Sequence, residues 1–391
     1  MDPDIPYLLL TPGPLTTSPA VRATMQRDYC TWDDDYNSIV RGIRSRLVKL
    51  ATQADPTKLP EFTSVLMQGS GTFSIEAAIG SLIPPTGKLL IVTNGAYRDR
   101  MVQIARCLRI AYTDIAFPET EPASPERVNE ALLADPNITH IALVHCETTT
   151  GMLNPVREIG AVAKNHNKTY MVDAMSSFGG IPIDMSDLQA DILVSSSNKC
   201  IQGVPGFGFV VVSRRLIEQT QGWARSVSLD LYDQWKTMEE KNGKWRYTSP
   251  THVVRALAEA LVELDQEGGV AARHRRYSEN QHRLVERMEE LGFRTLLPRR
   301  NHSPIITSFY YPDDPKFNFE TFYQALKRRR FVIYPGKISQ AETFRIGNIG
   351  HVFLEDIEQL GNAISEVVEE LGLRMPPQQT YVSPASASCE R

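Results

Sequence analysis

The sequence predicts an α/β protein: a large domain with a mostly parallel seven-stranded sheet, followed by a smaller C-terminal α+β domain. From about residue 62 to residue 213, short apolar runs alternate with helical patterns, which is typical of βαβ units. Some runs, such as Leu89–Val92, are apolar at every position, which indicates strands buried on both faces. After residue 293 the strands and helices follow in a different order, so a second domain is expected.

Each expected strand of the large domain is a short apolar run, and the helices between them carry apolar residues at helical spacing. The strands are expected at Ser64–Met67, Lys88–Val92, Ile110–Ile115, His140–Val144, Thr169–Val172, Ile192–Ser195 and Gly208–Val212. The helices are expected at Phe73–Leu82, Tyr97–Leu108, Pro125–Ala134 and Pro155–His166.

Two long helices are expected to lead into the smaller domain. Apolar residues recur at helical spacing in His252–Glu267, two glycines break the pattern, and Val270–Leu291 is charged and amphipathic. The smaller domain then shows strands and helices at Arg294–Leu297, Ile305–Tyr311, Phe319–Lys327, Phe331–Tyr334, Thr343–Ile346 and Leu354–Leu371.

These patterns divide the chain into four parts. An N-terminal segment covers residues 1–20, the large domain covers 21–265, and the small C-terminal domain covers 266–373. The tail at 374–391 is rich in proline, serine and alanine and has no periodicity, so it is predicted to be flexible.

The composition excludes several classes of protein. The chain is 42% hydrophobic and 23% charged, and its net charge of −4 offers no basic surface to nucleic acid or an anionic membrane. Five widely spaced cysteines without a Cys-x-x-Cys pair argue against a disulfide scaffold and a zinc site, so no metal is expected. Neither a secretory signal nor a membrane-length apolar run is found, and these patterns predict a cytoplasmic protein.

Two neighbouring strands are expected to deliver an acid and a lysine to one crevice. Asp173 ends one apolar run and Lys199 follows another, and in open α/β sheets the carboxyl ends of strands face the ligand. Such a pair suits pyridoxal 5′-phosphate (PLP), where lysine bonds the aldehyde as a Schiff base and the acid pairs with the protonated ring nitrogen. The pair alone also fits a helix-capping aspartate and a solvated lysine.

A phosphate site is predicted where Gly69-Ser70-Gly71-Thr72 follows a strand and opens a helix. Backbone N–H groups, the helix dipole and the hydroxyls of Ser70 and Thr72 suit a phosphate there. The segment lacks the ending of a Walker loop and the third glycine of a dinucleotide fingerprint. A plain glycine turn with Ser70 or Thr72 as a helix cap is the alternative.

Two further strand ends carry candidate residues. Tyr97 follows Asn94-Gly95-Ala96 and would lie flat on an aromatic ring, or else it is a core tyrosine. Thr148, within the run 147–151, would bond a ring substituent, or else its run caps a helix ahead of Pro155.

An arginine stands inside an apolar strand of the smaller domain. Arg345 requires an anionic partner there, and its planar fork suits a carboxylate or phosphonate. An ion pair with Glu342 is the alternative, while Gly347 suggests a close approach of another backbone segment. In contrast, the three acids Asp33–Asp35 read as a solvated loop.

The order of these motifs resembles that of the class V aminotransferases, which have PLP fold type I. The resemblance is carried by Leu-Leu-Leu-Thr-Pro-Gly-Pro at 8–14, Gly-Ser-Gly-Thr at 69–72, Glu-Thr-Thr-Thr-Gly at 147–151, Val-Asp-Ala-Met-Ser-Ser at 172–177, Ser-Asn-Lys at 197–199 and Phe-Arg-Ile-Gly at 344–347. Within that family, the strings at 30–36, 198–207, 243–252 and 344–350 resemble the 2-aminoethylphosphonate–pyruvate transaminases. The resemblance extends from about residue 6 to residue 372.

The resemblance implies a role for each matching residue. Lys199 and Asp173 are the implied catalytic residues, and Arg345 is the implied ligand of the substrate anion. The implied cofactor-binding residues are Ser70, Gly71, Thr72, Tyr97, Thr148, Asp173, Met175, Asn198, Lys199 and Thr248. Thr248 is supplied by the partner subunit in the family, which implies a homodimer with shared active sites.

The activity implied is PLP-dependent transfer of the amino group of 2-aminoethylphosphonate to pyruvate, giving phosphonoacetaldehyde and L-alanine in phosphonate degradation. An alanine–glyoxylate or serine–pyruvate aminotransferase of the same family is the alternative, because it shares the cofactor motifs. A nucleotide-binding oxidoreductase using residues 69–72 and a non-catalytic relative are less compatible with Asp173 and Lys199. Residues 54–62, which look like a lengthened loop, and the tail depart from the family without touching a motif.

Overall fold

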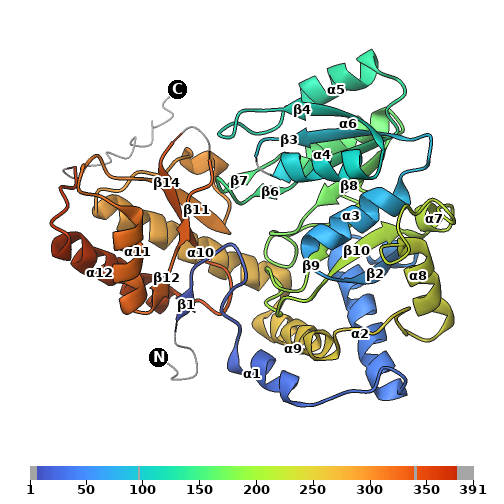
Figure 1. The fold of residues 1–391 in the computed structure, drawn as a ribbon, viewed down its shortest axis with the longest axis horizontal. Helices are drawn as coiled ribbons and strands as arrows, with labels where there is room; N and C mark the ends of the chain where they lie inside the picture. The colour runs from blue at the N-terminus through green and yellow to red at the C-terminus, as the bar shows by residue number, and fades with distance from the viewer. Residues whose placement is uncertain (1–6, 96, 339–340, 377–391) are drawn as a thin grey trace, which may run out of the picture.

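The computed structural model describes residues 7–95, 97–338 and 341–376, and within them the chain forms two lobes (Figure 1). The large lobe, residues 19–267, contains a seven-stranded sheet, and the small lobe, residues 269–376, contains a three-stranded sheet. Most of the predicted tail at 374–391 lies outside the described residues. None of the described helices is both long enough and apolar enough to cross a membrane.

The large sheet confirms the predicted, mostly parallel α/β architecture. Its strand order is β2-β10-β9-β8-β5-β3-β4, and only β10 runs antiparallel to its neighbours. The strands are β2 (Phe62–Gln68), β3 (Lys88–Thr93), β4 (Ala111–Ala116), β5 (His140–Val144), β8 (Thr169–Asp173), β9 (Ile192–Ser196) and β10 (Phe207–Ser213). The carboxyl ends of β2, β3, β5, β8 and β9 therefore share one edge of the sheet, which β10 enters with its first residue.

Helices cover both faces of this sheet. One face packs on α3 (Gly71–Leu82), α4 (Tyr97–Cys107), α7 (Arg214–Ile217) and α8 (Leu231–Glu240). The other face packs on α2 (Asp34–Ala51), α5 (Pro125–Ala134), α6 (Val156–Asn165) and α9 (Thr251–Glu267). Leu89 and Ile91 of β3 face one core and Leu90 and Val92 face the other, so the run is buried on both sides as predicted.

The acidic run Asp33–Asp35 does not form a solvated loop, so that prediction is wrong. Asp33 is the N-cap residue of α2, and Asp34 and Asp35 lie in its first turn. Carboxylates are favourable at this end of a helix because its unpaired N–H groups carry partial positive charge. Three adjacent acids were thus a helix-start signal.

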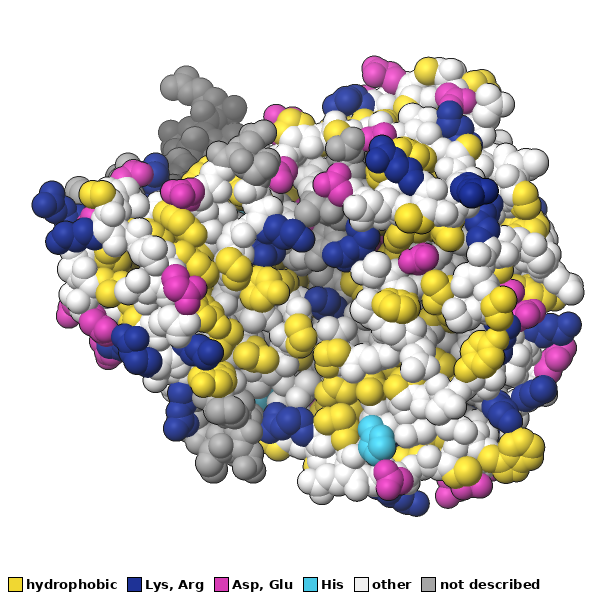
Figure 2. Space-filling view, viewed as in Figure 1, with side chains coloured by type: hydrophobic (Ala, Val, Ile, Leu, Met, Phe, Trp, Pro, Cys, Tyr) yellow, Lys and Arg dark blue, Asp and Glu magenta, His cyan; other side chains and the backbone are white. Residues whose placement is uncertain are grey.

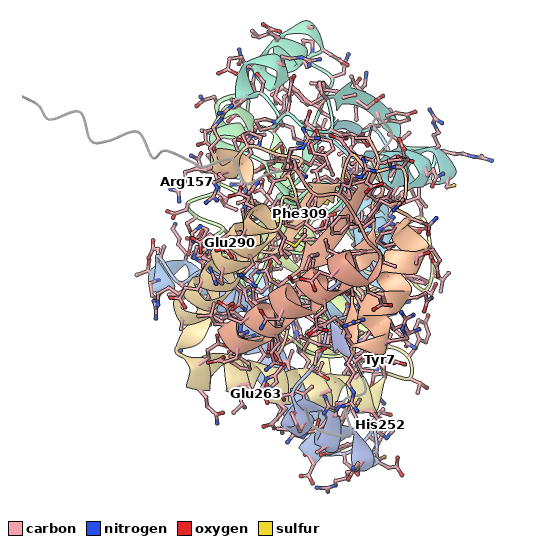
Figure 3. All side chains as sticks on the ribbon, turned by 90° about the vertical axis from the view of Figure 1, so that its left-hand side faces the viewer. Tyr7, Arg157, His252, Glu263, Glu290 and Phe309 are labelled. Atoms are coloured by element: carbon pink, nitrogen blue, oxygen red, sulfur yellow. The ribbon has the colours of Figure 1, made fainter. Side chains whose placement is uncertain are left out.

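The small lobe has a phenylalanine-rich core. Its sheet has the order β11-β14-β13, with β11 (Ile306–Tyr310), β13 (Tyr334–Pro335) and β14 (Thr343–Gly347). Helices α10 (Gly269–Glu290), α11 (Phe319–Arg328) and α12 (Leu354–Glu370) cover it, and Figure 3 looks onto this lobe with Phe309 labelled. The rings of Phe309 and Phe344 stack at 5.7 Å between centroids.

Three local predictions need correction. Arg294–Leu297 is no strand, because it forms only an isolated bridge from Thr295 to Phe309 before Pro298 turns the chain. Phe331–Tyr334 splits, since Phe331–Val332 (β12) pairs with Leu8–Leu9 (β1) while Tyr334–Pro335 pairs with β14. The expected loop at 54–62 is instead a 3-10 helix at Pro56–Glu61 that leads directly into β2.

The N-terminal segment connects the two lobes. Its strand β1 pairs in parallel with β12 of the small lobe, whereas α1 (Pro19–Ala23) and a 3-10 turn at Thr24–Gln26 pack on α9 of the large lobe. Residues 10–18 therefore cross from one lobe to the other. The remaining short elements are β6 (Cys146–Glu147), β7 (Met152–Leu153) and the 3-10 turn Arg299–Asn301.

Candidate active site

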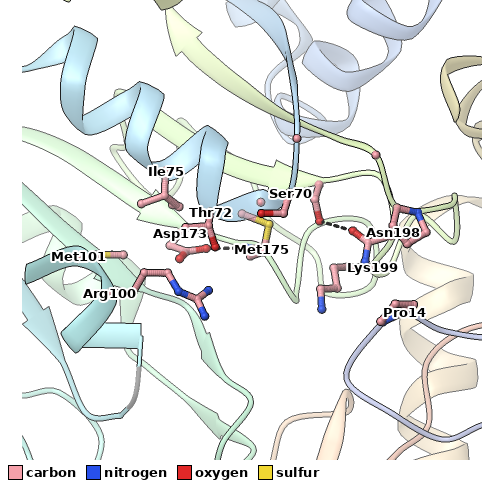
Figure 4. A pocket seen from close by; sticks show the side chains of 15 residues that line it. Pro14, Ser70, Thr72, Ile75, Arg100, Met101, Asp173, Met175, Asn198 and Lys199 are labelled. Carbon is pink, nitrogen blue, oxygen red and sulfur yellow. Dashed lines mark hydrogen bonds between the residues drawn. The ribbon is translucent and has the colours of Figure 1, made fainter. Parts of the chain in front are cut away.

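A cavity of about 570 Å³ lies at the edge of the large sheet where the parallel strands end. Of the predicted site residues, it brings together Ser70, Gly71, Thr72, Asp173, Met175, Asn198 and Lys199. Figure 4 shows Arg100 and Lys199 extending into it from two sides, and Figure 2 shows basic side chains around the hollow between the lobes. Among the described lining residues Asp173 is the single acid, so the cavity favours anions although the whole chain is acidic.

Lys199 follows β9 and its side chain is largely buried in the cavity. Its Nζ donates to the carbonyl oxygens of Pro12, at 2.8 Å, and Gly13, at 3.4 Å. Burial lowers the pKa of Lys199 to about 8, helped by the nearby guanidinium groups of Arg100 and Arg345 and opposed by Cys200 and Asp173. An appreciable fraction of this amine is therefore neutral near physiological pH, as a nucleophile or proton carrier requires.

Asp173 is the last residue of β8 and is 5% exposed. Its Oδ1 accepts a hydrogen bond of 2.9 Å from the backbone N–H of Met175. Burial raises the pKa of Asp173 to about 6, against the opposing effects of that bond, Arg100 and Lys199. A buried carboxylate of this kind is stabilised by a cationic group placed beside it.

The segment 69–72 forms the turn from β2 into α3, as predicted. Ser70 is the N-cap residue of α3, but its side chain makes no capping bond within the described structure, so the helix-cap interpretation does not account for its hydroxyl. A Cβ atom at Gly71 would lie 2.3 Å from Sδ of Met175, so the Met175 side chain would have to shift to admit a larger residue. The N–H groups at this helix start therefore face the cavity without an obstructing side chain.

Arg345 and Thr148 are in contact with each other, but neither is among the described residues that line the cavity. Arg345 is 4% exposed, and it donates from Nε to the Pro335 carbonyl and from an Nη to the Thr148 carbonyl, both at 2.9 Å. Its guanidinium carbon lies 5.0 Å from the ring centroid of Tyr334. These contacts fix the plane of the guanidinium relative to the 147–151 loop.

The close backbone approach predicted at Gly347 is confirmed. A Cβ atom there would lie 2.5 Å from the carbonyl oxygen of Thr11, and the Gly347 N–H donates to the Leu10 carbonyl at 3.0 Å. The strand that carries Arg345 is thus in direct contact with the N-terminal segment.

Besides Thr148, two predicted cofactor residues are not among the described residues that line the cavity. The backbone of Tyr97 begins α4, but its side chain lies outside the described part of the structure. Thr248 is exposed in the loop before α9 and is not among the described residues that line the cavity. Its role as a cofactor ligand therefore stays a prediction that requires a second subunit.

The strings at 30–36 and 243–252 pack against each other although they are distant in sequence. The Tyr36 hydroxyl and Ser249 Oγ lie 2.5 Å apart, and Nζ of Lys244 lies 4.2 Å from the ring centroid of Trp32. Burial raises the pKa of Tyr36 to about 12, so its hydroxyl stays protonated. The two strings that carry the narrower resemblance form one surface of the large lobe.

Sequence reasoning missed Arg100 and the turn at residues 11–14. Arg100 lines the cavity from the first turn of α4, and its place at the start of a helix that follows a strand was the available signal. The turn had no such signal, because its contact with Lys199 spans 187 positions.

The raised pKa of Asp173 predicts that the cofactor-free protein becomes less stable as pH rises. Because the folded-state pKa rises from 3.8 to about 6, the unfolded chain releases this proton first, and stability falls by roughly 3 kcal/mol as pH rises through that window. Asp173→Asn should therefore stabilise the cofactor-free protein at pH 7, and the gain should shrink toward pH 5. Urea unfolding at both pH values measures it, with Asp313→Asn as the exposed control. A gain independent of pH would contradict the assigned ionisation.

Comparison with known proteins gives one consistent family. The model of the aminotransferase class-V family matches residues 32–337. A 2-aminoethylphosphonate–pyruvate transaminase of Syntrophobacter fumaroxidans is 59% identical over 370 residues, which cover 95% of this chain and 98% of that protein. One of the same name from Vibrio cholerae is 58% identical over 363 residues, covering 93% and 98%. The solved structure of an alanine–glyoxylate aminotransferase from Nostoc sp. matches with a TM-score of 0.84 at 26% identity, covering 93% of this chain and 95% of that one.

Proposed function

The chain belongs to the class V aminotransferase family, and on that premise we propose that it transfers the amino group of 2-aminoethylphosphonate to pyruvate. The products are phosphonoacetaldehyde and L-alanine. The relatives of that name share 58–59% of their residues with this chain over nearly its full length, whereas the alanine–glyoxylate enzyme of Nostoc sp. shares 26%. The choice of donor therefore follows the more similar relatives.

The residues of the cavity fit PLP as the cofactor. Asp173 is a buried carboxylate with a raised pKa, and such a group gains stability from a protonated ring nitrogen beside it. The start of α3, with the Ser70 hydroxyl and the open backbone at Gly71, suits the phosphate. When bound, PLP supplies an aldehyde that takes up amino groups and a ring that accepts electrons. The meeting of Asp173 and Lys199 in one cavity is the observation that carries this assignment.

Lys199 is placed to hold the cofactor and to move the proton. Its pKa of about 8 lets the amine take a proton from the substrate carbon and give it back within the same cavity. Asp173 would hold a protonated ring nitrogen by its charge, and the backbone N–H of Met175 fixes the orientation of its carboxylate. Both groups act at the strand ends, where the sheet holds them rigidly.

Arg345 is the proposed ligand of the substrate anion. A phosphonate enters in one half of the reaction and a carboxylate in the other, and a planar guanidinium binds either one. Its contacts with the Thr148 and Pro335 carbonyls hold it in position before substrate arrives.

The proposed activity is tested by comparing the products formed from different pairs of amino donor and acceptor. Purified protein with added PLP should form L-alanine from pyruvate when 2-aminoethylphosphonate is the donor. Serine with pyruvate and alanine with glyoxylate are run beside it at equal concentrations. Activity confined to these two pairs would overturn the phosphonate assignment and leave the aminotransferase assignment intact.

A homodimer with shared active sites is part of the proposal. Thr248 is exposed and away from the cavity of its own chain, as a residue offered to a partner would be. Large apolar side chains are exposed nearby and beside the phosphate turn: Trp32 at 76%, Val227 at 75%, Tyr247 at 53% and Phe73 at 49%. Such exposed apolar groups are typical of protein interfaces.

Mixing two inactive variants tests the sharing. Lys199→Ala lacks the lysine, and Thr248→Ala should load poorly at limiting PLP. When the two are unfolded and refolded together, each mixed dimer regains one intact site, so about a quarter of all sites recover if pairing is random. Alanine formation at limiting PLP measures the recovery, and each variant refolded alone is the control. No gain on mixing would contradict sharing through Thr248.

A further inference from the structure

A turn of the N-terminal segment holds the amine of Lys199. Among the described residues, Nζ donates to two backbone carbonyls, those of Pro12 at 2.8 Å and Gly13 at 3.4 Å. A Cβ atom at Gly13 would lie 2.7 Å from Nζ, so the turn covers the amine at van der Waals distance. Pro14, the next residue, lines the cavity beside it (Figure 4).

Thr11 builds this turn with its side chain. Its hydroxyl donates to the Pro14 carbonyl at 2.5 Å and accepts from the Gly13 N–H at 3.1 Å. Thr11 is 5% exposed, so water does not readily replace either bond. The hydroxyl therefore fixes the direction in which the carbonyls of Pro12 and Gly13 point.

The same turn is attached to the strand of Arg345. Gly347 packs directly under the Thr11 backbone and bonds the Leu10 carbonyl, and β1 pairs with β12 just before it. The turn that holds the Lys199 amine is therefore in direct contact with the small lobe.

We propose that Thr11 is a positioning residue for the Lys199 amine, acting through the carbonyls of Pro12 and Gly13. The inference rests on the proposed transamination, in which Lys199 would be freed from the cofactor while substrate is bound. During that interval the lysine is a free amine that must carry one proton and return to the same place. Carbonyl oxygens only accept hydrogen bonds, so they hold the protonated amine, which has three N–H donors and a positive charge, more strongly than the neutral amine.

The test compares Thr11→Val, which keeps the shape of the side chain but removes the hydroxyl, with Thr11→Ser, which keeps the hydroxyl. Thr11→Val should lower kcat by about tenfold, which corresponds to ~1.4 kcal/mol, at an unchanged KM. Thr11→Ser should stay within about twofold of the parent, the range expected when the hydrogen bonds are retained. Thermal unfolding and cofactor absorbance confirm that both variants fold and load PLP.

A second readout does not depend on activity. In enzyme loaded with pyridoxamine phosphate, Lys199 is not bonded to the cofactor, and cyanate labels it only when it is neutral. In Thr11→Val the carbonyls of Pro12 and Gly13 are no longer held toward the amine, so they favour its charged form less. The midpoint of labelling against pH should therefore fall by about one pH unit. Asp173, Arg100, Arg345 and Cys200 also face Lys199, and they are the same in all variants.

The outcomes separate this inference from the proposed function. If Thr11→Val shows the same labelling profile as the parent enzyme, the positioning role is overturned. The same holds if the substitution changes only the thermal stability. Equal losses in Thr11→Val and Thr11→Ser overturn it as well. If the parent enzyme fails to use 2-aminoethylphosphonate but labels as expected, the substrate assignment is wrong and the positioning role stands.

Discussion

Lys199→Ala abolishes transamination while the protein still binds PLP. The variant loses both the covalent attachment and the proton carrier, so the expected fall in kcat is about 10⁴-fold or more, the upper end for general acid–base groups. Binding persists because Asp173 and the start of α3 are untouched. Borohydride should fix the cofactor to the parent chain and bleach its yellow band, but fix none to the variant. The measurements are alanine formation and the mass of the borohydride-treated chain.

Two controls sharpen this result. Lys164→Ala removes an exposed lysine of α6 and should retain parent activity. Small primary amines added to Lys199→Ala should restore part of the turnover, because they can carry the proton in the space that the side chain leaves. Full activity of Lys199→Ala without added amine would show that another group does the chemistry.

Asp173→Asn is expected to lower kcat by about 10²–10⁴-fold, because a neutral amide cannot stabilise a protonated ring nitrogen. Removing one partner of a buried charge pair costs roughly 3–5 kcal/mol, which converts to that range. The same substitution stabilises the cofactor-free fold at pH 7, so activity and stability change in opposite directions. The checks are steady-state kinetics at saturating PLP and urea unfolding of the cofactor-free protein.

This opposition distinguishes a functional carboxylate from a structural one. If Asp173 served only the fold, its replacement would lower both stability and activity. Asp173→Glu keeps the charge but moves it by one methylene group, so it should retain more activity than Asp173→Asn. Asp173→Asn with near-parent kcat would remove Asp173 from the mechanism.

The large lobe could be predicted from sequence because its signals are local. Runs such as Leu89–Val92 are apolar on both faces, and helices separate most of them in sequence, so the parallel sheet follows from the pattern. The start of α2 was misread because Asp33–Asp35 were judged by charge and not by their position before a helical pattern. The split at Phe331–Tyr334 depends on two different partner strands, and no local pattern encodes partners.

The site residues also fall into those that a local sequence pattern predicts and those that only the fold brings together. Asp173, Lys199 and the phosphate turn were found because each lies at or just beyond the end of a strand, and the parallel sheet brings strand ends together. The carbonyls of Pro12 and Gly13 reach Lys199 through the chain crossing between the lobes. Backbone groups have no residue-specific signature, so only the folded chain reveals such a contact.

The packing of segment 30–36 against segment 243–252 has a consequence for how the two segments can change in sequence. Tyr36 and Ser249 share a hydrogen bond of 2.5 Å in the interior, and a change in either one leaves a buried hydroxyl of the other to be accommodated. The two segments must therefore change in sequence together. A chimera that exchanges only one of them would place mismatched side chains at the contact between the segments. An engineer who exchanges one of these segments in this scaffold should therefore exchange the other with it.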